Sequence, residues 1–206
     1  MTASVDLLVA SSNAKKLIEL KELLSDLPFR IFGLRDFPKV TLVAETEKTF
    51  EGNALFKARG YADQTGLLTV AEDSGICCDA LDGAPGIYSA RFSGERATDH
   101  GNNQKLLRLL DKVPDNCRGA HYVSVIAVAE PHKVIGIVTG KVHGYISREL
   151  RGTSGFGYDP LFFYPHFNKT FGEISLEMKQ KVSHRARAFE KARLLLEDYL
   201  RLKVRS

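Results

Sequence analysis

Short apolar runs alternate with amphipathic helical patterns along most of this chain, and this alternation constrains the fold more than any other feature. The apolar runs have the length of buried strands, which are predicted at 5–10, 30–34, 67–70 and 76–81. Helical patterns, with leucine, alanine or aromatic side chains on one face, are predicted at 17–27, 50–61, 97–110 and 184–199. Strands that alternate with helices in this way are typical of α/β proteins.

A long hairpin interrupts the alternation. Two further strands are predicted at 120–129 and 134–146, joined by the turn Glu130-Pro131-His132-Lys133. The hairpin and the alternating pattern together predict an α/β fold with a mixed β-sheet and flanking helices. Since no internal repeat, low-complexity tract or clear linker is found, we expect one domain over residues 1–206.

The composition is that of an ordinary globular protein with a mild excess of positive charge. Of 206 residues, 29 are Lys or Arg and 25 are Asp or Glu, which gives a formal net charge of +4. This excess suits a polyanionic ligand. It lacks the clustered basic face typical of nucleic-acid binding, so we expect no nucleic-acid partner.

The lengths of the apolar runs and the spacing of the cysteines indicate in which cell compartment the protein is located. The longest apolar run, around 123–129, is far too short to span a membrane, and the first residues lack the basic region of a signal peptide. The three cysteines, Cys77, Cys78 and Cys117, have no C-x-x-C spacing and indicate neither a zinc site nor a disulfide framework. We expect a cytoplasmic protein with no membrane contact, whose cysteines are small buried hydrophobic residues.

A polar segment lies where the first strand ends and the first helix begins: Ser11-Ser12-Asn13-Ala14-Lys15-Lys16. Free backbone N–H groups and the helix dipole make such a junction an anion site, to which hydroxyl, amide and lysine groups add donors. The alternative is ordinary capping of the helix by Ser12 or Asn13, with solvated lysines.

Two carboxylates follow the strand at 67–70 in the segment Glu72-Asp73-Ser74-Gly75, which we interpret as a turn. Ligand sites in open α/β sheets lie at the carboxyl ends of strands, and Mg²⁺ is commonly held by one or two carboxylates plus substrate phosphates. A polar turn without a ligand is the alternative. Glu45 is a further acidic candidate, or else a surface carboxylate. Lys57 lies on or beside the apolar helix stripe, where it is either paired or extends its stem to solvent.

A glycine-rich loop at 152–160 places an aromatic residue beside an acid, in Ser154-Gly155-Phe156-Gly157-Tyr158-Asp159-Pro160. A base-binding pocket needs such a pair, because the ring stacks on the base and the acid hydrogen-bonds to it. The alternative is a plain turn before a strand at 161–164. At the start of the last helix, Ser183-His184-Arg185 offers donors to a carbonyl or an anion, or forms a cap with a charged first turn.

Taken together and in order, these segments resemble the inosine triphosphate pyrophosphatase family, over nearly the whole chain. The resemblance also rests on Thr49-Phe50-Glu51-Gly52-Asn53-Ala54 with Lys57-Ala58-Arg59, and on Gly83-Ala84-Pro85-Gly86-Ile87-Tyr88-Ser89-Ala90-Arg91. That family hydrolyses non-standard purine nucleoside triphosphates. The resemblance implies an elongated mixed sheet with two lobes around a central cleft, a Mg²⁺ cofactor, a nucleoside triphosphate substrate and a homodimer.

The resemblance further implies a role for each matching residue. The triphosphate would be bound by Ser12, Asn13, Lys16, Lys57 and Ser74. Mg²⁺ would be held by Glu45, Glu72 and Asp73, and Asp73 would also activate the attacking water. Phe156 would stack on the base, surrounded by Gly157, Tyr158, Asp159, Lys179, His184 and Arg185. The chain departs from the family's common pattern at Ser12, where Gly is frequent, and at Glu72, where Asp is frequent.

The residue chemistry agrees with hydrolysis of ITP, dITP or XTP to the monophosphate and pyrophosphate. Phosphoanhydride hydrolysis depends mostly on positioning and charge neutralisation, which lysines, carboxylates and Mg²⁺ supply. One alternative is a related pyrophosphatase for pyrimidine or modified nucleotides, which the purine-type pocket disfavours. A second is a basic nucleic-acid-binding module, which needs aromatic residues interleaved with basic ones, an array that the sequence lacks.

Overall fold

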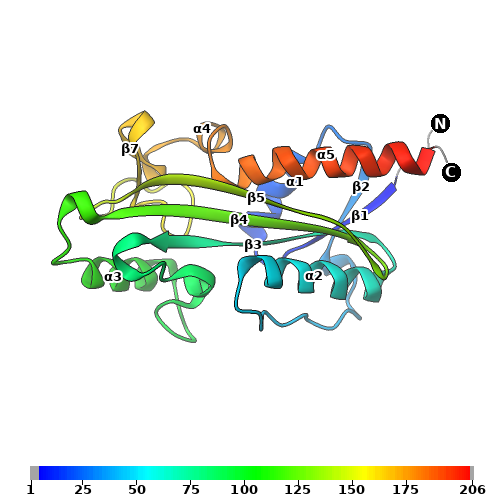
Figure 1. Cartoon of the computed structure of the whole chain (residues 1–206), viewed down its shortest axis with the longest axis horizontal. Coiled ribbons are helices and arrows are strands. Elements are labelled where there is room, and N and C mark those ends of the chain that lie inside the picture. Colours follow the sequence, from blue (N-terminus) through cyan, green and yellow to red (C-terminus); the bar gives the residue numbers. More distant parts are fainter. Residues whose placement is uncertain (1–4, 205–206) are drawn as a thin grey trace. The chain divides into compact units, whose positions relative to one another are not determined.

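The computed structural model describes residues 5–204 and confirms an α/β fold with a mixed sheet (Figure 1). Among these residues the sheet order is β2-β1-β3-β4-β5-β6-β7. The strands are β1 (Val5–Ala10), β2 (Phe29–Gly33), β3 (Leu68–Cys78), β4 (Gly119–Glu130), β5 (Lys133–Ile146), β6 (Phe162–Tyr164) and β7 (Lys169–Thr170). The helices are α1 (Ala14–Leu23), α2 (Phe50–Thr65), α3 (Asp99–Leu109), α4 (Leu176–Gln180) and α5 (His184–Val204).

The chain forms two compact units, each with its own hydrophobic core. The first comprises the chain up to Asp73, Ser124–Thr139 and the chain from Arg187 onward. The second comprises Ser74–Val123 and Gly140–Ala186. The boundaries fall inside β3, β4 and β5, so each of these strands contributes residues to both units. Neither unit is therefore a continuous stretch of sequence.

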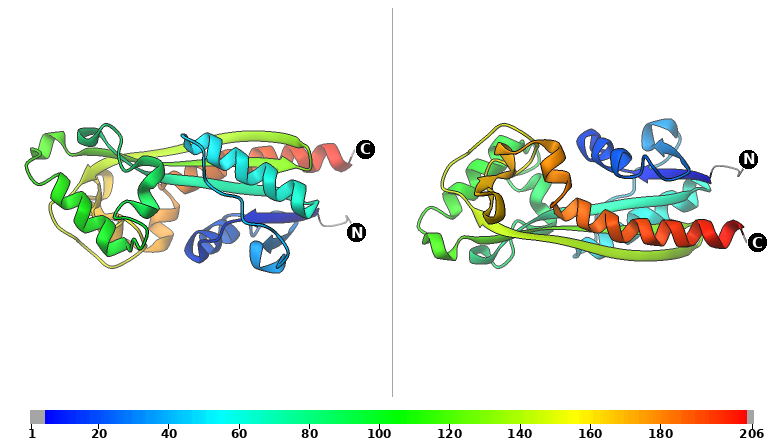
Figure 2. Two further views of the ribbon diagram at one scale, coloured as in Figure 1. Left: turned by 90° about the horizontal axis from the view of Figure 1, so that it is seen from below. Right: turned by 90° about the horizontal axis from the view of Figure 1, so that it is seen from above.

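In the first unit, helices cover both faces of the strands (Figures 1 and 2). Helices α1 and α5 share one face, and their apolar side chains meet those of β1, β3 and β4 in a single core. The fully buried members of this core include Leu7, Val70, Leu20, Ile126 and Leu196. Burial of each such side chain stabilises the fold by about 1.5–3 kcal/mol.

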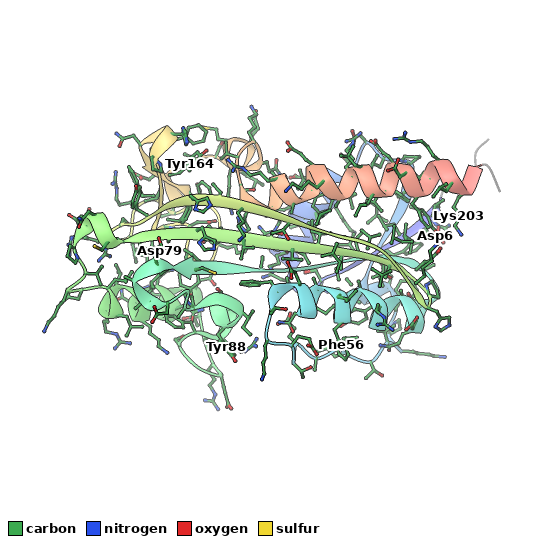
Figure 3. All side chains as sticks on the ribbon, in the orientation of Figure 1. Asp6, Phe56, Asp79, Tyr88, Tyr164 and Lys203 are labelled. Atoms are coloured by element: carbon green, nitrogen blue, oxygen red, sulfur yellow. The ribbon has the colours of Figure 1, made fainter. Side chains whose placement is uncertain are left out.

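Helix α2 lies on the other face of these strands, and a side-chain cap fixes its start. The Thr49 hydroxyl accepts the backbone N–H of Gly52 at 3.0 Å, as is typical of a helix N-cap. Phe56 is 48% exposed and points away from the sheet (Figure 3). The buried apolar face of α2 is the predicted one and includes Ala54, Ala58 and Tyr61.

The second unit has an aromatic core. Helix α3 contributes Leu106, and its C-cap contributes Leu110. The segment from β6 onward contributes Phe162 and Phe171, and all four side chains are fully buried. The rings of Phe162 and Phe171 lie 4.9 Å apart, a separation at which aromatic pairs attract beyond simple burial. β6 pairs antiparallel with β5, with Phe163 opposite Tyr145, which attaches this segment to the hairpin.

The predicted break between strands 67–70 and 76–81 is wrong. β3 runs continuously from Leu68 to Cys78, so Glu72-Asp73-Ser74-Gly75 is extended strand and not a turn. The strand continues because its buried acidic side chains have partners: the Ser124 hydroxyl on β4, for example, donates to Glu72 at 2.7 Å. A buried carboxylate with such partners costs far less than an isolated one.

The expectation of three buried cysteines is only partly correct. Cys78 is buried, but Cys77 is half-buried and Cys117 is exposed. Cys117 ends a short 3₁₀ segment, Asp115–Cys117, which places its side chain at the surface and not in a strand. Within residues 5–204, no helix combines the length and the apolar character needed to cross a membrane.

Arg118 is a buried side chain that ties together backbone ends of the second unit. Its guanidinium donates to the carbonyl oxygens of Leu110 at 2.6 Å, Ile146 at 2.7 Å and Ser147 at 3.0 Å. Leu110 is the C-cap residue of α3 and Ile146 ends β5, positions where carbonyl groups no longer have partners within their own element. Arg118 therefore satisfies groups that burial would otherwise leave without a donor.

We expect Arg118→Met to lower the free energy of unfolding by about 3 kcal/mol, because buried carbonyl oxygens lose their donors. For a chain of this size that corresponds to a Tm lower by roughly 6–12 °C in a circular-dichroism melt. Arg148→Met is the matched control. Arg148 also bonds two carbonyl oxygens and Asp115, but it is half-exposed, so its loss should cost less than about 1 kcal/mol. Equal losses in the two variants would contradict this role.

Candidate functional site

Strand register brings two of the predicted site segments together in the first unit. β1 and β3 are parallel, with Ala10 opposite Ala71. The segment that follows Ala10 and the acidic residues that follow Ala71 therefore begin at the same level of the sheet. Lys16, in the first turn of α1, reaches across, with its Nζ 3.4 Å from Oε2 of Glu72.

Lys57 is the centre of this group. It is only 8% exposed, and its ammonium contacts Glu45 Oε1 at 2.7 Å, the Glu72 carbonyl oxygen at 2.8 Å and Asp73 Oδ1 at 3.3 Å. Burial lowers the pKa of Lys57, but the carboxylates of Asp73 and Glu45 raise it more, so its pKa lies above the ordinary value. Lys57 is therefore a paired, charged lysine, and its stem does not extend to solvent.

Glu72 and Asp73 are both buried, at 4% and 6% exposure, and differ in their partners. Glu72 accepts the Ser124 hydroxyl at 2.7 Å and faces Lys16. Asp73 accepts the amide of Asn53 at 3.1 Å as well as Lys57. Burial raises the pKa of the Asp73 carboxyl, against the opposing effect of Lys57 and with a further contribution from Glu45. We call Lys16, Glu45, Lys57, Glu72 and Asp73 the lysine–carboxylate cluster.

The segment before α1 caps the helix, as one of the two interpretations of the sequence predicts. The Asn13 side-chain oxygen accepts the backbone N–H of Lys16 at 3.2 Å, and Ser11 accepts the N–H of Asn13 at 3.3 Å. Ser12 and Asn13 are both exposed. Capping and anion binding are compatible here, because capping uses the Asn13 side-chain oxygen, while the Lys16 ammonium lies beside Glu72.

A second group of predicted residues gathers in the second unit around Phe156. The Lys179 ammonium lies 4.8 Å from the centre of the Phe156 ring, and the Arg185 guanidinium lies 5.4 Å from it. Cations at these distances are attracted to the face of an aromatic ring. We call Phe156, Asp159, Lys179, His184 and Arg185 the aromatic–cation cluster.

Asp159 links the other parts of this second cluster through hydrogen bonds. Its Oδ2 accepts the Lys179 ammonium at 2.7 Å and the backbone N–H of Phe156 at 2.8 Å. Gly155, at φ +76°, lies so close that a Cβ there would collide with the Asp159 carboxylate. A glycine is thus required where the loop folds over its own acid.

His184 and Arg185 are placed by neighbours on β3 and β4. The ring of His184 stacks on that of Tyr122, with centres 4.5 Å apart and planes 7° from parallel. The Tyr122 hydroxyl lies 3.5 Å from Asp159 Oδ1, and burial raises its pKa well above the ordinary value, so it remains a donor. Arg185 donates to the Ser74 hydroxyl at 3.3 Å, which brings Ser74 into contact with this cluster.

Two predicted base-binding residues lie differently. The Tyr158 side chain belongs to the second core and donates to the Ser89 carbonyl oxygen at 2.8 Å. Gly157 donates its N–H to Asp99 at 2.9 Å and accepts the Asn103 amide at 2.8 Å. These residues anchor the loop that carries Phe156 and Asp159, and the Tyr158 ring faces the core.

Three residues that contact these clusters were not predicted from the sequence: Asn53, Tyr122 and Ser124. Asn53 lies in a segment that carries the resemblance, but no role followed from that. Ser124 is a polar residue in the otherwise apolar run 123–129, and Tyr122 is two positions before it on β4. A buried hydroxyl in an apolar strand usually has a polar partner, and that signal could have identified Ser124.

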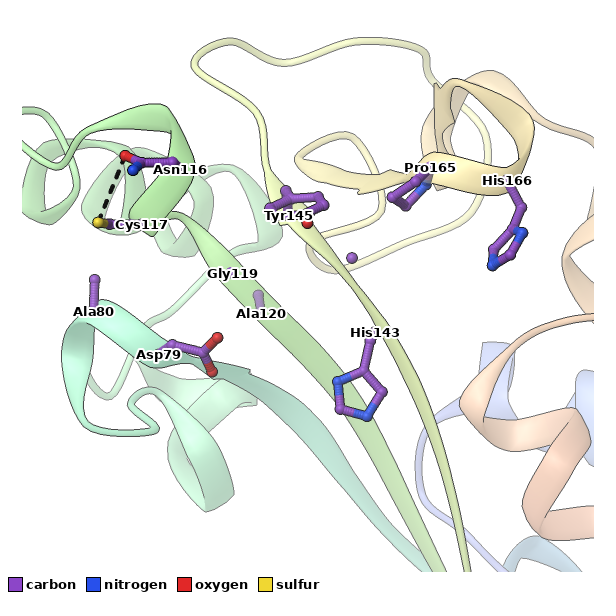
Figure 4. Close-up of a pocket in the computed structure, with 11 residues that line it drawn as sticks. Asp79, Ala80, Asn116, Cys117, Gly119, Ala120, His143, Tyr145, Pro165 and His166 are labelled. Atoms are coloured by element: carbon purple, nitrogen blue, oxygen red, sulfur yellow. Dashed lines mark hydrogen bonds between the residues drawn. The ribbon is translucent and has the colours of Figure 1, made fainter.

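A hollow of about 740 Å³ in the second unit is separate from both clusters (Figure 4). It is lined by residues that include Asp79, Cys117, His143, Tyr145 and His166. None of the predicted site residues lines it, so we do not assign it to the candidate site.

The chemistry of the lysine–carboxylate cluster fits a hard divalent cation. Glu45, Glu72 and Asp73 offer carboxylate oxygens, the ligand type that Mg²⁺ prefers. In the part of the chain that the structure describes, no three His, Cys, Asp or Glu side chains form a ready metal site. Mg²⁺ commonly takes one or two protein carboxylates and completes its shell with substrate phosphates and water, so these residues suit it without a preformed cage.

The protein is an α/β protein in which one cluster is suited to anionic groups and the other to an aromatic group. The chain belongs to the Ham1 family, whose model matches residues 7–194.

Relatives and solved structures match over nearly the full length. A protein of Desulforamulus reducens named dITP/XTP pyrophosphatase is 47% identical over 190 residues, which cover 92% of this chain and 94% of the relative. One of the same name from Geobacter sulfurreducens is 48% identical over 194 residues, covering 94% and 96%. The structure of a HAM1 protein from Coxiella burnetii matches with a TM-score of 0.87 at 40% identity, over 94% of this chain and 99% of that one. These matches confirm the family predicted from the sequence.

Removal of Lys57 should lower the stability of the fold, because Lys57 neutralises buried negative charge. We expect Lys57→Met to lower the free energy of unfolding by about 3–5 kcal/mol, because the buried Asp73 carboxylate loses its cation. Adding Asp73→Asn should recover part of that loss. Urea denaturation of both variants tests this. Lys181→Met, which breaks an exposed pair with Glu177, is the control and should change stability by less than about 1 kcal/mol. A double variant as unstable as the single one would refute charge pairing as the cause.

Proposed function

We propose that this chain is a Mg²⁺-dependent hydrolase that converts ITP, dITP and XTP to the monophosphate and pyrophosphate. It removes non-standard purine nucleotides from the cytoplasmic pool and works as a homodimer. The observation that carries the proposal is the lysine–carboxylate cluster, in which Lys16 and Lys57 lie within ion-pair distance of Glu45, Glu72 and Asp73. Relatives named dITP/XTP pyrophosphatase support the same substrate class.

The triphosphate is bound on the side of the lysine–carboxylate cluster. Lys16 and Lys57 carry the positive charge, and Ser12, Asn13 and Ser74 add hydrogen-bond donors. Glu45, Glu72 and Asp73 would hold Mg²⁺, which when bound neutralises phosphate oxygens and lowers the cost of charge that develops in the reaction. Lys16 and Lys57 lie beside these carboxylates, so the residues that would hold the cation and the residues that would bind the phosphates belong to one cluster.

Asp73 acts as the general base. Its buried carboxyl has a raised pKa, which makes the carboxylate a stronger proton acceptor than an exposed aspartate. Asp73 takes a proton from a water molecule, the water oxygen forms a bond to the α-phosphorus, and the bond from the α-phosphorus to the bridging oxygen breaks. Pyrophosphate leaves with that oxygen, and no covalent enzyme intermediate forms.

The base is recognised by the aromatic–cation cluster. Phe156 stacks on the purine. In the structure, Lys179 and Arg185 lie against the ring of Phe156. Hypoxanthine and xanthine carry a carbonyl at position 6, which accepts hydrogen bonds from His184 and Arg185. Adenine carries an amine there, and Arg has no acceptor to offer it. The pocket therefore disfavours ATP, because its hydrogen-bond donors would be left unpaired. GTP shares the carbonyl at position 6, so weaker use of GTP depends on a different contact.

The product identifies the bond that is cleaved. Incubation with ITP and Mg²⁺ should give IMP and pyrophosphate, separated by anion-exchange chromatography, and excess chelator should abolish the reaction until Mg²⁺ is restored. A panel that includes dITP, XTP, GTP, ATP and dUTP ranks the bases in the same experiment. IDP and orthophosphate as first products would contradict the mechanism. Preferred turnover of dUTP would instead support a pyrimidine nucleotide pyrophosphatase.

The ratio of ITP to ATP activity tests the base pocket. In the wild type we expect kcat/KM for ITP to exceed that for ATP by up to roughly 10⁴-fold, the range reached by sites built on buried hydrogen bonds. Arg185→Ala should reduce this ratio more than it weakens pyrophosphate inhibition, which reports phosphate affinity. Because both substrates see the same enzyme sample, a lower active fraction cannot change the ratio. Arg187→Ala, an exposed position on the same helix, is the control. Equal wild-type values for ITP and ATP would refute the pocket while leaving the hydrolysis intact.

A further inference from the structure

Asn53 is almost completely buried, at 1% exposure, and contacts both Asp73 of the lysine–carboxylate cluster and the backbone of the segment that carries Glu45. Its side-chain oxygen accepts the backbone N–H of Glu47 at 3.0 Å. Its amide nitrogen donates to Asp73 Oδ2 at 3.1 Å. The single side chain thus connects Asp73 to the segment that carries Glu45.

These two bonds fix which way the amide faces. A backbone N–H can only donate, so the group that meets Glu47 must be the Asn53 oxygen. The NH₂ group is then turned toward Asp73, where it meets a carboxylate that can only accept. Each bond sets the orientation needed by the other, so the amide has one satisfied arrangement.

Helix α2 presents two donors to the same carboxylate. Asn53 and Lys57 are four residues apart and lie on one face of the helix. Asn53 donates to Oδ2 of Asp73 and Lys57 approaches Oδ1. A carboxylate held at both oxygens from one rigid element cannot rotate, yet each oxygen keeps a second lone pair for water.

We propose that Asn53 is a positioning residue that holds the Asp73 carboxylate in the orientation from which it accepts the proton of the attacking water. The inference deepens the proposed function and rests on it. Asn53 touches neither substrate nor water in this role, and it acts through Asp73. Lys57 neutralises the charge of the Asp73 carboxylate, whereas Asn53 fixes its orientation.

Asn53→Asp separates the two contacts. The new side chain keeps an oxygen for the Glu47 N–H and replaces the donor toward Asp73 with a second carboxylate oxygen. We expect kcat for dITP to fall about 10–100-fold, as for a catalytic group moved by about 1 Å, while KM changes less than about threefold. Asn53→Ala, which adds no charge, should also lower kcat and serves if the aspartate variant does not fold.

Gln64 provides a matched control on the same helix. Its amide oxygen accepts the backbone N–H of Thr41 at 2.7 Å, and its nitrogen donates to the Thr41 carbonyl at 3.1 Å. It therefore also fastens α2 to the segment before it, without contact to Asp73. Gln64→Glu makes the same chemical change as Asn53→Asp and should leave kcat and KM at wild-type values.

A double-mutant cycle separates positioning from general loss of folded enzyme. Asp73→Asn alone should lower kcat by about 10²–10⁴-fold, as expected for loss of a general base. If Asn53 acts through Asp73, then adding Asn53→Asp to that variant should lower kcat by less than about threefold further. A merely structural role would reduce the active fraction equally in both backgrounds, so the two effects would multiply.

The outcomes are distinct. Pyrophosphate release by the wild type, a drop in kcat for Asn53→Asp but not for Gln64→Glu, and a non-multiplicative double variant together support the inference. Wild-type kcat in both Asn53 variants, or fully multiplicative effects with Asp73→Asn, would overturn it while the proposed function stands. A wild-type protein that releases no pyrophosphate from dITP would overturn the proposed function itself.

Discussion

Pairing of charges away from water is the interaction on which the rest of the first unit's candidate site depends. Lys57 is buried among Glu45, the Glu72 backbone and Asp73, and an unpaired ammonium or carboxylate in that position would be costly. The pairing also explains local structure. β3 can carry two acidic residues through the middle of a sheet because lysines, a serine and an asparagine meet them there. The positive and negative charges of the lysine–carboxylate cluster therefore neutralise one another in the folded unit.

The second cluster follows a different principle, in which cations rest on an aromatic face. Lys179 and Arg185 lie against Phe156, and Asp159 anchors both Lys179 and the loop itself. Tyr122 supports this group from β4 through its contacts with His184 and Asp159. Two positions further along the same strand, Ser124 supports Glu72. One strand therefore supplies buried hydroxyl groups to both clusters.

Local pattern was sufficient for much of the fold. Helix α2, with its Thr49 cap and alanine stripe, and the hairpin of β4 and β5 follow from spacing that acts over a few residues. The acidic segment at 72–75 was predicted as a turn because four polar or small residues in a row are typical of turns. Its extended conformation is supported by the contact of Glu72 with Ser124, which lies 52 positions away in the sequence. Asn53 was equally hidden: its partner Asp73 lies 20 positions away, and no local rule states that an amide will find a carboxylate. Motif resemblance located the charged residues, whereas the uncharged ones that orient them depend on register.

The division of the chain between its two units has a consequence for how the protein is made. Every residue of the second unit precedes Arg187, while the first unit needs α5, whose Phe189 and Leu196 lie in its core. A ribosome delivers the chain from the N-terminus, so the second unit is fully synthesised before the first can close. Until α5 has been synthesised, the apolar side chains of β1, β3 and β4 that pack against it lack this cover. Helix α5 is thus the element whose synthesis completes the core of the first unit.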